Sequence, residues 1–294
     1  MKNLFLFLFL LVVFTSKAQD NRVSGLNSRQ FTKYWKVESE SPDYKVTFQG
    51  DTAEIVSPKG LTLWRKEKMS GKVTIEYDAC VVVESDGDRL SDLNCFWMAS
   101  DPQYPDNLWK REKWRSGIFL NCYSLQLYYL GYGGNHNSTT RFRRYDGDES
   151  GITNPKARPA ILKEYTDAGH LLKPNHWYHI KITNENNRVS YYIDGERLVD
   201  FRDAEPLREG WFGFRTTLSR TRITNFSYEC SSQEAAAVPL QWIGETPRQD
   251  KAVSFGVPFD KGEVFRKTSY GYLQKVVRIF LLILGLWLIG RMVL

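Results

Sequence analysis

The sequence lacks the cysteine and histidine motifs that usually bind metals. It has only four cysteines, Cys80, Cys95, Cys122 and Cys230, and no C-x-x-C pair. Its four histidines show neither H-E-x-x-H nor H-x-x-x-H spacing, so they offer no zinc site on a helix face. We therefore expect no metal ligands. Cys80 and Cys122 lie in apolar segments and are expected to be small buried residues.

Two function classes also lack their usual signals. Lys and Arg exceed Asp and Glu by 40 to 34, but they are spread along the chain without an RNA- or DNA-binding motif. An acidic glycan is therefore a better expected partner than a nucleic acid. A paired-carboxylate glycosidase needs two acids on one strand face. Glu76 and Asp78 have that spacing, but no third acid completes an E-x-D-x-x-E pattern, which counts against hydrolysis.

Helical periodicity is nearly absent, and strand patterns replace it. Val73–Val83 alternates apolar and polar residues with the period of a half-buried strand. Arg188–Ile193 and Arg197–Phe201 flank Asp194-Gly195, a dipeptide typical of type I′ hairpin turns. Many short strands with regular turn signals predict an all-β fold of two packed antiparallel sheets. Other strands are expected at Asn94–Ala99, Ile118–Leu130, Trp211–Arg215 and Ile223–Glu229.

Long hydrophobic runs occur only at the two ends of the chain. Lys2 precedes the apolar run Leu4–Phe14, and small residues follow at the cleavage positions. This pattern predicts a signal peptide over 1–18 and an exported protein, either periplasmic or extracellular. The tail at 276–294 is apolar with flanking arginines, but its uninterrupted part is shorter than the roughly 20 residues of a membrane helix. Membrane anchoring and a non-native end of the reading frame are equal alternatives for this tail.

Several long motifs follow one another in the order NCFWMASDPQYPDNL, SLQLYYLGYGGNHNSTTRFRRYDGD, LLKPNHWYHIKI, VSYYIDGERLVDF and EGWFGFRTTLSRTRITNF. Through them, residues 31 to 230 resemble a concanavalin A-like jelly-roll family of unknown function from bacterial polysaccharide-utilisation clusters. The resemblance implies a two-sheet antiparallel jelly roll that holds a saccharide on its concave face. It also implies neighbouring enzymes that degrade uronate-containing polymers such as pectin or ulvan. Concanavalin A-like folds often bind calcium, but no dense acidic loop supports it here, so no cofactor is predicted.

A second motif, PLQWIGETPRQDKAVSFGVPFDKGEV, is similar to the start of exo-acting rhamnogalacturonan lyase-like proteins. The similarity ends within a short segment, so this chain is not expected to carry that lyase's chemistry. The expected organisation is a signal peptide at 1–18, a jelly-roll domain at 19–230, a linker at 231–237, the incomplete start of a second β domain at 238–268 and a hydrophobic tail at 276–294.

The segment Leu125–Asp148 has the strongest indication of a binding site. Its glycines permit a sharp bend between an apolar strand and a basic one. On the second strand Arg141, Arg143 and Tyr145 share one face, and Phe142 points to the core from the other. Two arginines about 7 Å apart on one strand face can clamp a carboxylate or sulfate group. The alternative is an exposed basic strand with surface ion pairs.

His136 stands in the bend between Asn135 and Asn137, just before those arginines. β-Elimination on a uronate needs positive charge to neutralise the carboxylate and a base that removes the neighbouring C5 proton near neutral pH. We predict His136 or Tyr132 as the base, the two arginines as the clamp, and an asparagine of the bend as an assisting donor. The leaving group is either a sugar, as in a polysaccharide lyase, or water, as in an oligosaccharide dehydratase.

Aromatic and basic residues outside the bend complete the predicted site. Trp97 and Trp109 are candidates for stacking on sugar rings, although core packing is an equal alternative for Trp97. Arg215 and Tyr145 are expected to contact the ligand, which we predict to be an acidic oligosaccharide or polysaccharide. A non-catalytic glycan-binding module is an alternative to a lyase, and a glycoside hydrolase is a third alternative by analogy with other jelly rolls.

Overall fold

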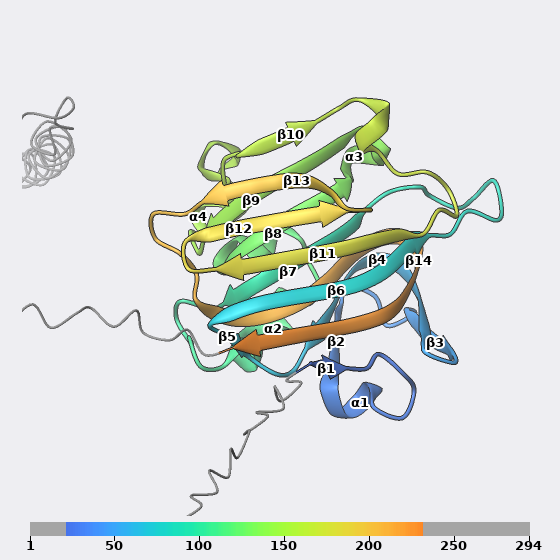
Figure 1. The fold of residues 1–294 in the computed structure, drawn as a ribbon, viewed down its shortest axis with the longest axis horizontal. Coiled ribbons are helices and arrows are strands. Elements are labelled where there is room, and N and C mark those ends of the chain that lie inside the picture. Colours follow the sequence, from blue (N-terminus) through green and yellow to red (C-terminus); the bar gives the residue numbers. More distant parts are fainter. Residues whose placement is uncertain (1–21, 232–294) are drawn as a thin grey trace, which may run out of the picture. The chain divides into compact units, whose positions relative to one another are not determined.

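The computed structural model describes residues 22–231 (Figure 1). The predicted signal peptide, the linker beyond Ser231, the second β domain and the hydrophobic tail lie outside the described residues. Within 22–231, no helix is both long and apolar enough to cross a membrane.

The described part is a two-sheet antiparallel jelly roll, as predicted. In Figure 1 one sheet, here called the β11 sheet, lies in front of the other, the β8 sheet. The β11 sheet contains, in order, β3 (Lys45–Gln49), the first half of β4 (Thr52–Arg65), the second half of β14 (Glu209–Ser231), β6 (Lys72–Val81), β11 (Tyr178–Glu185), β12 (Arg188–Ile193) and β13 (Glu196–Arg202). The β8 sheet contains β2 (Trp35–Ser39), the second half of β4, the first half of β14, β7 (Leu93–Ser100), β8 (Gln126–Gly133), β9 (Thr139–Asp146) and β10 (Lys163–Tyr165).

Short elements connect these strands. They are β1 (Val23–Ser24), α1 (Phe31–Tyr34), β5 (Met69–Ser70), η1 (Leu108–Arg111), α2 (Glu112–Arg115), η2 (Leu120–Ser124), α3 (Gly134–Asn137), α4 (Ser150–Thr153), η3 (Pro155–Ala157) and η4 (Ala168–His170). The predicted hairpin is confirmed, since Asp194 and Gly195 join β12 to β13 with φ values of 51° and 84°. The predicted strand at Ile118–Leu130 is wrong in its first half, because η2 occupies that part and β8 begins only at Gln126.

β14 is one continuous strand, whereas two separate strands were predicted for this region. Trp211–Arg215 pairs with β7, and Thr221–Ser231 pairs with β6, so one strand serves both sheets. The pairing with β4 shifts between Thr217 and Ser219, where Leu218 has a φ of 50°. A bulge of this kind bends a strand without ending it, which is why the polar residues at the bend do not mark a turn between two strands.

Two hydrophobic cores use opposite faces of the β8 sheet. The inner core lies between the sheets and contains Trp97 and Phe142, and the outer core contains Phe96, Tyr129 and Tyr145. This alternation follows from the two-residue period of β-strands. Segment 101–124, with η1, α2 and η2, packs on the outer core. The groove described below lies beside this core. Cys80 and Cys122 are buried, as predicted, and their thiols are free.

Candidate basic groove

An open groove of about 460 Å³ lies on the outer face of the β8 sheet. Its floor comes from β7, β8, β9 and β14, and α3 and η2 form parts of its wall. The groove brings together five residues of the predicted site: Asn135, His136, Arg141, Arg143 and Arg215. Arg141 and Arg143 share this face while Phe142 lies in the inner core, so the predicted alternation of β9 is confirmed.

The floor of the groove is a polar row that runs across four neighbouring strands. Arg215 of β14 pairs with Asn94 of β7, Asn94 with Gly131 of β8, and Gly131 with Arg141 of β9. Since neighbouring strands are about 4.8 Å apart, the backbone distance from one arginine to the other is roughly 14 Å. Such a row offers polar contacts to an extended ligand lying across the strands.

Gly131 leaves a gap in the middle of this row. A Cβ atom at that position would lie 2.3 Å from the hydroxyl of Tyr129 on the same strand. A glycine at position 131 therefore leaves the space that the Tyr129 hydroxyl occupies in the row. Burial and the charge of Asp92 raise the pKa of Tyr129, and the charges of Arg215 and Arg143 oppose this shift. These two arginines therefore act on Tyr129 and place positive charge near the middle of the row.

Backbone carbonyls and one carboxylate fix the three arginines of the predicted site. Arg141 pairs with Glu164 at 2.6 Å, so its charge is already balanced. Arg143 donates to the carbonyl of Pro159. Arg215 is only 3% exposed, donates to the carbonyl of Gly117 at 2.5 Å and lies over the ring of Phe119. Fixed guanidinium groups lose little side-chain entropy when an anion binds.

The turn α3 holds His136 at the rim of the groove in an unusual backbone conformation. Asn135, His136 and Asn137 have φ values of 50°, 57° and 58°, in the left-handed region that asparagine tolerates better than most residues. The Asn137 side chain accepts from the Leu172 N–H at 2.8 Å and donates to the Leu172 carbonyl at 2.9 Å. Asn137 therefore anchors the turn, and its predicted role as a donor to the substrate is wrong. Asn135 and His136 stay exposed on the groove side.

Tyr132 cannot be the base that the sequence predicted. It points to the inner face of β8, donates to the Leu171 carbonyl at 3.3 Å and packs edge-on against Tyr178. Burial raises its pKa, which opposes proton abstraction near neutral pH. The prediction did not apply the two-residue strand period to β8. Tyr132 is next to Gly131, which lies on the groove face, so the Tyr132 side chain lies on the opposite face.

Three predicted ligand contacts belong to the hydrophobic packing instead. Trp97 is 0% exposed in the inner core, where it stacks with Phe142, so it cannot stack on a sugar. Tyr145 is 0% exposed in the outer core, although it is on the groove side of β9. Trp109 packs against Trp211 and beneath Lys36, away from the residues that line the groove. The aromatic character of these residues alone did not show whether their rings lie in the core or on the surface.

Asn94, Tyr129, Arg89 and Arg158 also line the groove, and the sequence did not single them out. Asn94 is 6% exposed, and its Oδ1 has no hydrogen-bond partner within residues 22–231. Its amide donates to Asp92, which also pairs with Arg89 at 2.7 Å. The alternation of N-C-F-W was the available signal, because it places Asn94 on the face opposite to the core residue Trp97.

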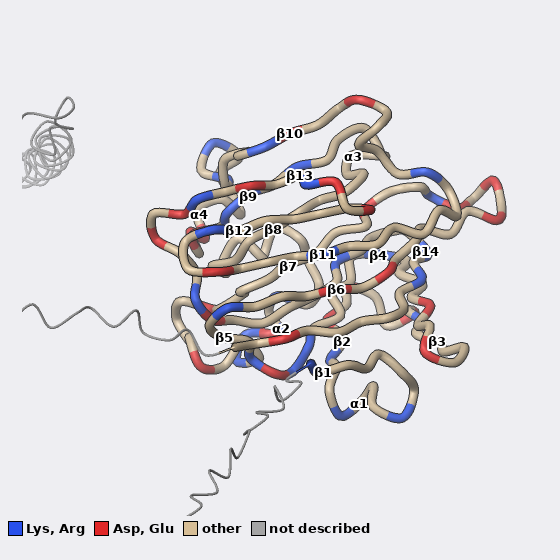
Figure 2. Tube along the Cα trace, in the orientation of Figure 1, with Lys and Arg blue, Asp and Glu red and all other residues tan. Residues whose placement is uncertain are grey.

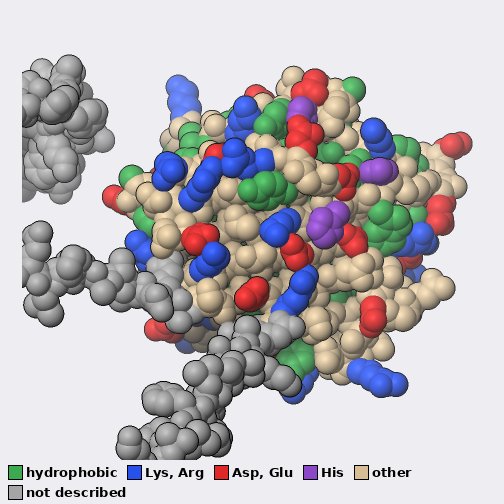
Figure 3. Space-filling model, viewed as in Figure 1, with side chains coloured by type: hydrophobic (Ala, Val, Ile, Leu, Met, Phe, Trp, Pro, Cys, Tyr) green, Lys and Arg blue, Asp and Glu red, His purple; other side chains and the backbone are tan. Residues whose placement is uncertain are grey.

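The lining of the groove is basic, with five arginines, one histidine and the two carboxylates Glu40 and Asp92. Elsewhere the charges are mixed. Figure 2 shows acidic and basic positions interspersed along the chain, and the face over the β11 sheet in Figure 3 carries both signs side by side. The groove therefore stands out by charge, which favours anionic ligands. Within 22–231, no group of three or more acidic, histidine or cysteine side chains could hold a metal ion.

The fold and the groove define a concanavalin-like jelly roll with a basic groove on one sheet. The chain belongs to the family described as the domain of unknown function DUF6250, whose model matches residues 55–226. No curated protein matches the sequence.

Solved structures resemble the chain at low sequence identity. A Bacillus subtilis protein of unknown function with a galectin-like fold has a TM-score of 0.56 at 16% identity, and the match covers 71% of this chain and 94% of that one. The carbohydrate-binding module CBM66 from Bacillus subtilis has a TM-score of 0.44 at 15% identity, covering 66% and 94%. The VIP36 exoplasmic/lumenal domain has a TM-score of 0.48 at 9% identity, covering 74% and 92%.

Proposed function

We propose that this protein binds a uronate-containing saccharide in the basic groove and breaks it by β-elimination. The observation that carries the proposal is that the polar row and an exposed histidine meet in one groove. The fold supports it by analogy, since a protein with a galectin-like fold resembles it. The predicted signal peptide would export the protein to a compartment where polysaccharide fragments occur.

The proposed chemistry assigns a role to each side of the row. Arg143 and Arg215 neutralise the uronate carboxylate around the Tyr129 hydroxyl, which makes the C5 proton easier to remove. His136 takes that proton, the electron pair forms the C4–C5 double bond, and the bond from C4 to its oxygen substituent breaks. The leaving oxygen takes a proton from solvent, so that the substituent departs as a sugar or as water. Arg141, whose charge Glu164 balances, adds a donor at the end of the row.

The test is an absorbance assay near 235 nm, where the unsaturated uronate absorbs, with pectic, ulvan and glucuronate oligosaccharides. His136→Asn is the informative variant, because asparagine tolerates the left-handed backbone of position 136 and should leave the turn intact. We expect kcat/KM to fall at least about 100-fold, the usual contribution of a general base. His179→Asn, on β11 and outside the groove lining, is the matched control and should keep full activity.

Three results would contradict the proposal in different ways. Heat of binding without any rise at 235 nm would indicate a non-catalytic binding module. Release of reducing ends without that absorbance would indicate hydrolysis. Loss of activity in both histidine variants would show that position 136 has no special role.

A further inference from the structure

The arginines of the groove differ in how their charge is balanced. Arg89 and Arg141 pair with Asp92 and Glu164 at 2.7 and 2.6 Å. Arg143 and Arg158 have no salt bridge to a carboxylate within residues 22–231, and their partners there are uncharged groups. Arg215, at the other end of the row, also has no salt bridge in the described residues, but it is only 3% exposed. The more accessible uncompensated charge is therefore on the side of the groove next to β9 and η3.

These two arginines meet at one place because the chain holds them there. Arg143 donates to the carbonyl of Pro159, the residue that follows Arg158. Arg158 donates to the Gly151 carbonyl at 3.4 Å and lies 5.9 Å from the centre of the Tyr123 ring. A Cβ on Gly151 would lie 3.2 Å from the Ala157 carbonyl and 3.3 Å from the Arg158 Cα, so the glycine allows this close packing.

The Tyr123 hydroxyl supplies an unused donor at the same place. Tyr123 is 6% exposed and lines the groove, and its hydroxyl has no hydrogen-bond partner in the described part of the chain. Burial raises the pKa of Tyr123, so the hydroxyl keeps its proton, and the charges of Arg158 and Arg143 oppose the shift, which shows that both act on this ring. Two guanidinium groups and a protonated hydroxyl form a donor set for a tetrahedral or planar oxyanion.

We propose that Arg158, Tyr123 and the outer edge of Arg143 form a second anion subsite, so that the preferred ligand is a saccharide with at least two negative groups. The first is the uronate carboxylate at Arg143 and Arg215, and the second is a sulfate ester or another carboxylate on a neighbouring sugar. A guanidinium has five N–H donors on more than one edge, so Arg143 can serve both groups. This inference rests on the proposed binding of acidic saccharides but not on the elimination chemistry.

The experiment is calorimetric titration of the full chain at fixed ionic strength with three oligosaccharides of equal length. One carries a single uronate, one carries the same uronate with a sulfate ester on the next sugar, and one carries two adjacent uronates. We expect one of the doubly charged ligands to bind about tenfold more tightly than the first, the size of one charge-assisted hydrogen bond. The ligand that shows this preference identifies the second group.

Arg158→Gln should reduce this preference to less than twofold, whereas Arg197→Gln should retain it. Arg197 is an exposed residue on β13 that pairs with Asp200 at 3.2 Å, outside the groove lining, so it controls for the loss of one surface charge. Equal weakening of all three ligands by Arg158→Gln, or no preference in the unmodified protein, overturns the second subsite. Tighter binding of a doubly charged ligand without a rise in absorbance at 235 nm contradicts only the elimination proposal. A rise in absorbance without tighter binding of a doubly charged ligand contradicts only the second subsite.

Discussion

Asp203 is a single carboxylate that ties the end of β13 to two strands of the other sheet. It is 5% exposed and accepts hydrogen bonds from the Tyr128 hydroxyl at 2.6 Å, the Arg144 Nε at 2.7 Å and the Glu205 N–H at 2.9 Å. Burial alone would raise its pKa, but these three donors together lower it. The pair with Asp203 also balances the charge of Arg144, whose side chain points away from the groove.

Asp203→Asn should destabilise the protein at pH 7 by about 1–3 kcal/mol, since it removes charge-assisted hydrogen bonds from a buried site. The folded pKa of Asp203 lies below the ordinary value of 3.8. Its contribution is therefore fully present above that value and is lost as the pH falls through the folded pKa. Urea denaturation at pH 7 and in steps below pH 4 measures both effects. The difference in free energy of unfolding between the variant and the parent should become smaller as the pH falls.

Asp51→Asn is the control for this prediction, because Asp51 is an exposed residue next to β4 whose side chain makes no described hydrogen bond. It should change the free energy of unfolding by no more than about 0.5 kcal/mol. If the stability difference for Asp203→Asn stays constant down to the lowest pH, the lowered pKa of Asp203 does not contribute to stability as proposed.

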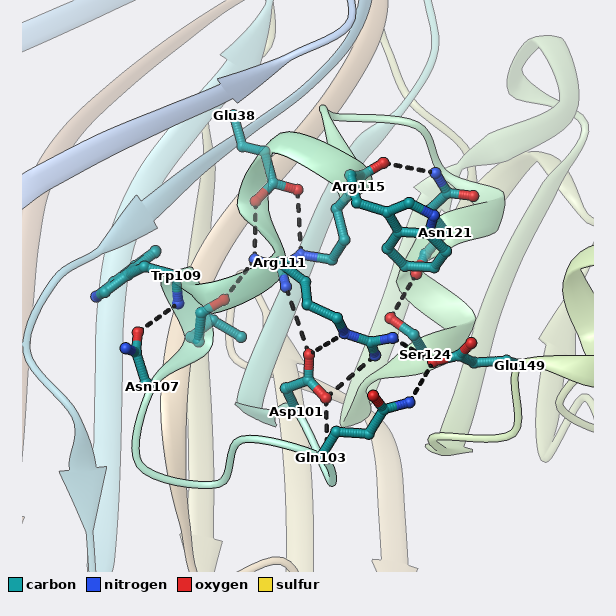
Figure 4. A network of polar contacts seen from close by, with 12 residues as sticks. Glu38, Asp101, Gln103, Asn107, Trp109, Arg111, Arg115, Asn121, Ser124 and Glu149 are labelled. Carbon is teal, nitrogen blue, oxygen red and sulfur yellow. Dashed lines mark hydrogen bonds and ion pairs between the residues drawn. The ribbon is translucent and has the colours of Figure 1, made fainter.

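At the scale of an element, segment 101–124 depends on a network of buried charges (Figure 4). Arg115 is 0% exposed, pairs with Glu38 of β2 at 2.9 Å and donates to the Leu108 carbonyl at 2.7 Å. Arg111 pairs with Asp101 at 2.7 Å and also with Glu149. The network therefore joins the segment to β2 and to the residue before α4, and it fixes Asp101, the first residue after β7. The same segment supplies groove residues of η2, so it shapes the groove wall.

Arg115→Met should destabilise the protein by about 3–5 kcal/mol, because it leaves Glu38 buried without its partner. The paired variant Glu38→Met/Arg115→Met should recover most of that loss, since two apolar side chains of similar volume need no counter-charge. Chemical denaturation measures both. We also expect weaker saccharide binding by Arg115→Met, because the groove wall loses its support. A double variant no more stable than the single one would show that the pair is not the reason for the effect.

Most strands could be predicted from the sequence. For the site, the sequence predicted which residues of one strand share a face, but not which strands lie side by side. Period-two alternation in Leu125–Asp148 correctly put Arg141 and Arg143 on one face, and it would have removed Tyr132 from the site if applied to β8 as strictly. The polar row needs the pairing of β14 with β7 and of β7 with β8, which depends on register between distant segments. Sequence periodicity can give the face on which Asn94 lies, but it contains no information on that register, so the row across the four strands was not predicted.

At the scale of the whole molecule, β14 links the two cores. Trp211 and Phe212 are neighbours on this strand, yet Trp211 packs in the outer core and Phe212 in the inner core. Each core also contains a buried free cysteine, Cys122 in the outer and Cys95 in the inner core, and burial raises the pKa of both thiols to about 12. Since one strand packs into both cores, neither core can lose its packing without disturbing the other.

Trp211→Ala and Phe212→Ala should therefore weaken the same cooperative unit, each by about 3–5 kcal/mol. Pulsed thiol labelling in increasing urea, read by peptide mapping, follows Cys95 and Cys122 separately. We expect the two thiols to become reactive at one midpoint in the unmodified protein, and either variant to lower both midpoints together. Labelling of Cys122 well before Cys95 in Trp211→Ala would show instead that the outer core, with the groove wall packed on it, opens as a separate unit. In that case β14 would act as a support for two independent layers, and a ligand in the groove would stabilise only one of them.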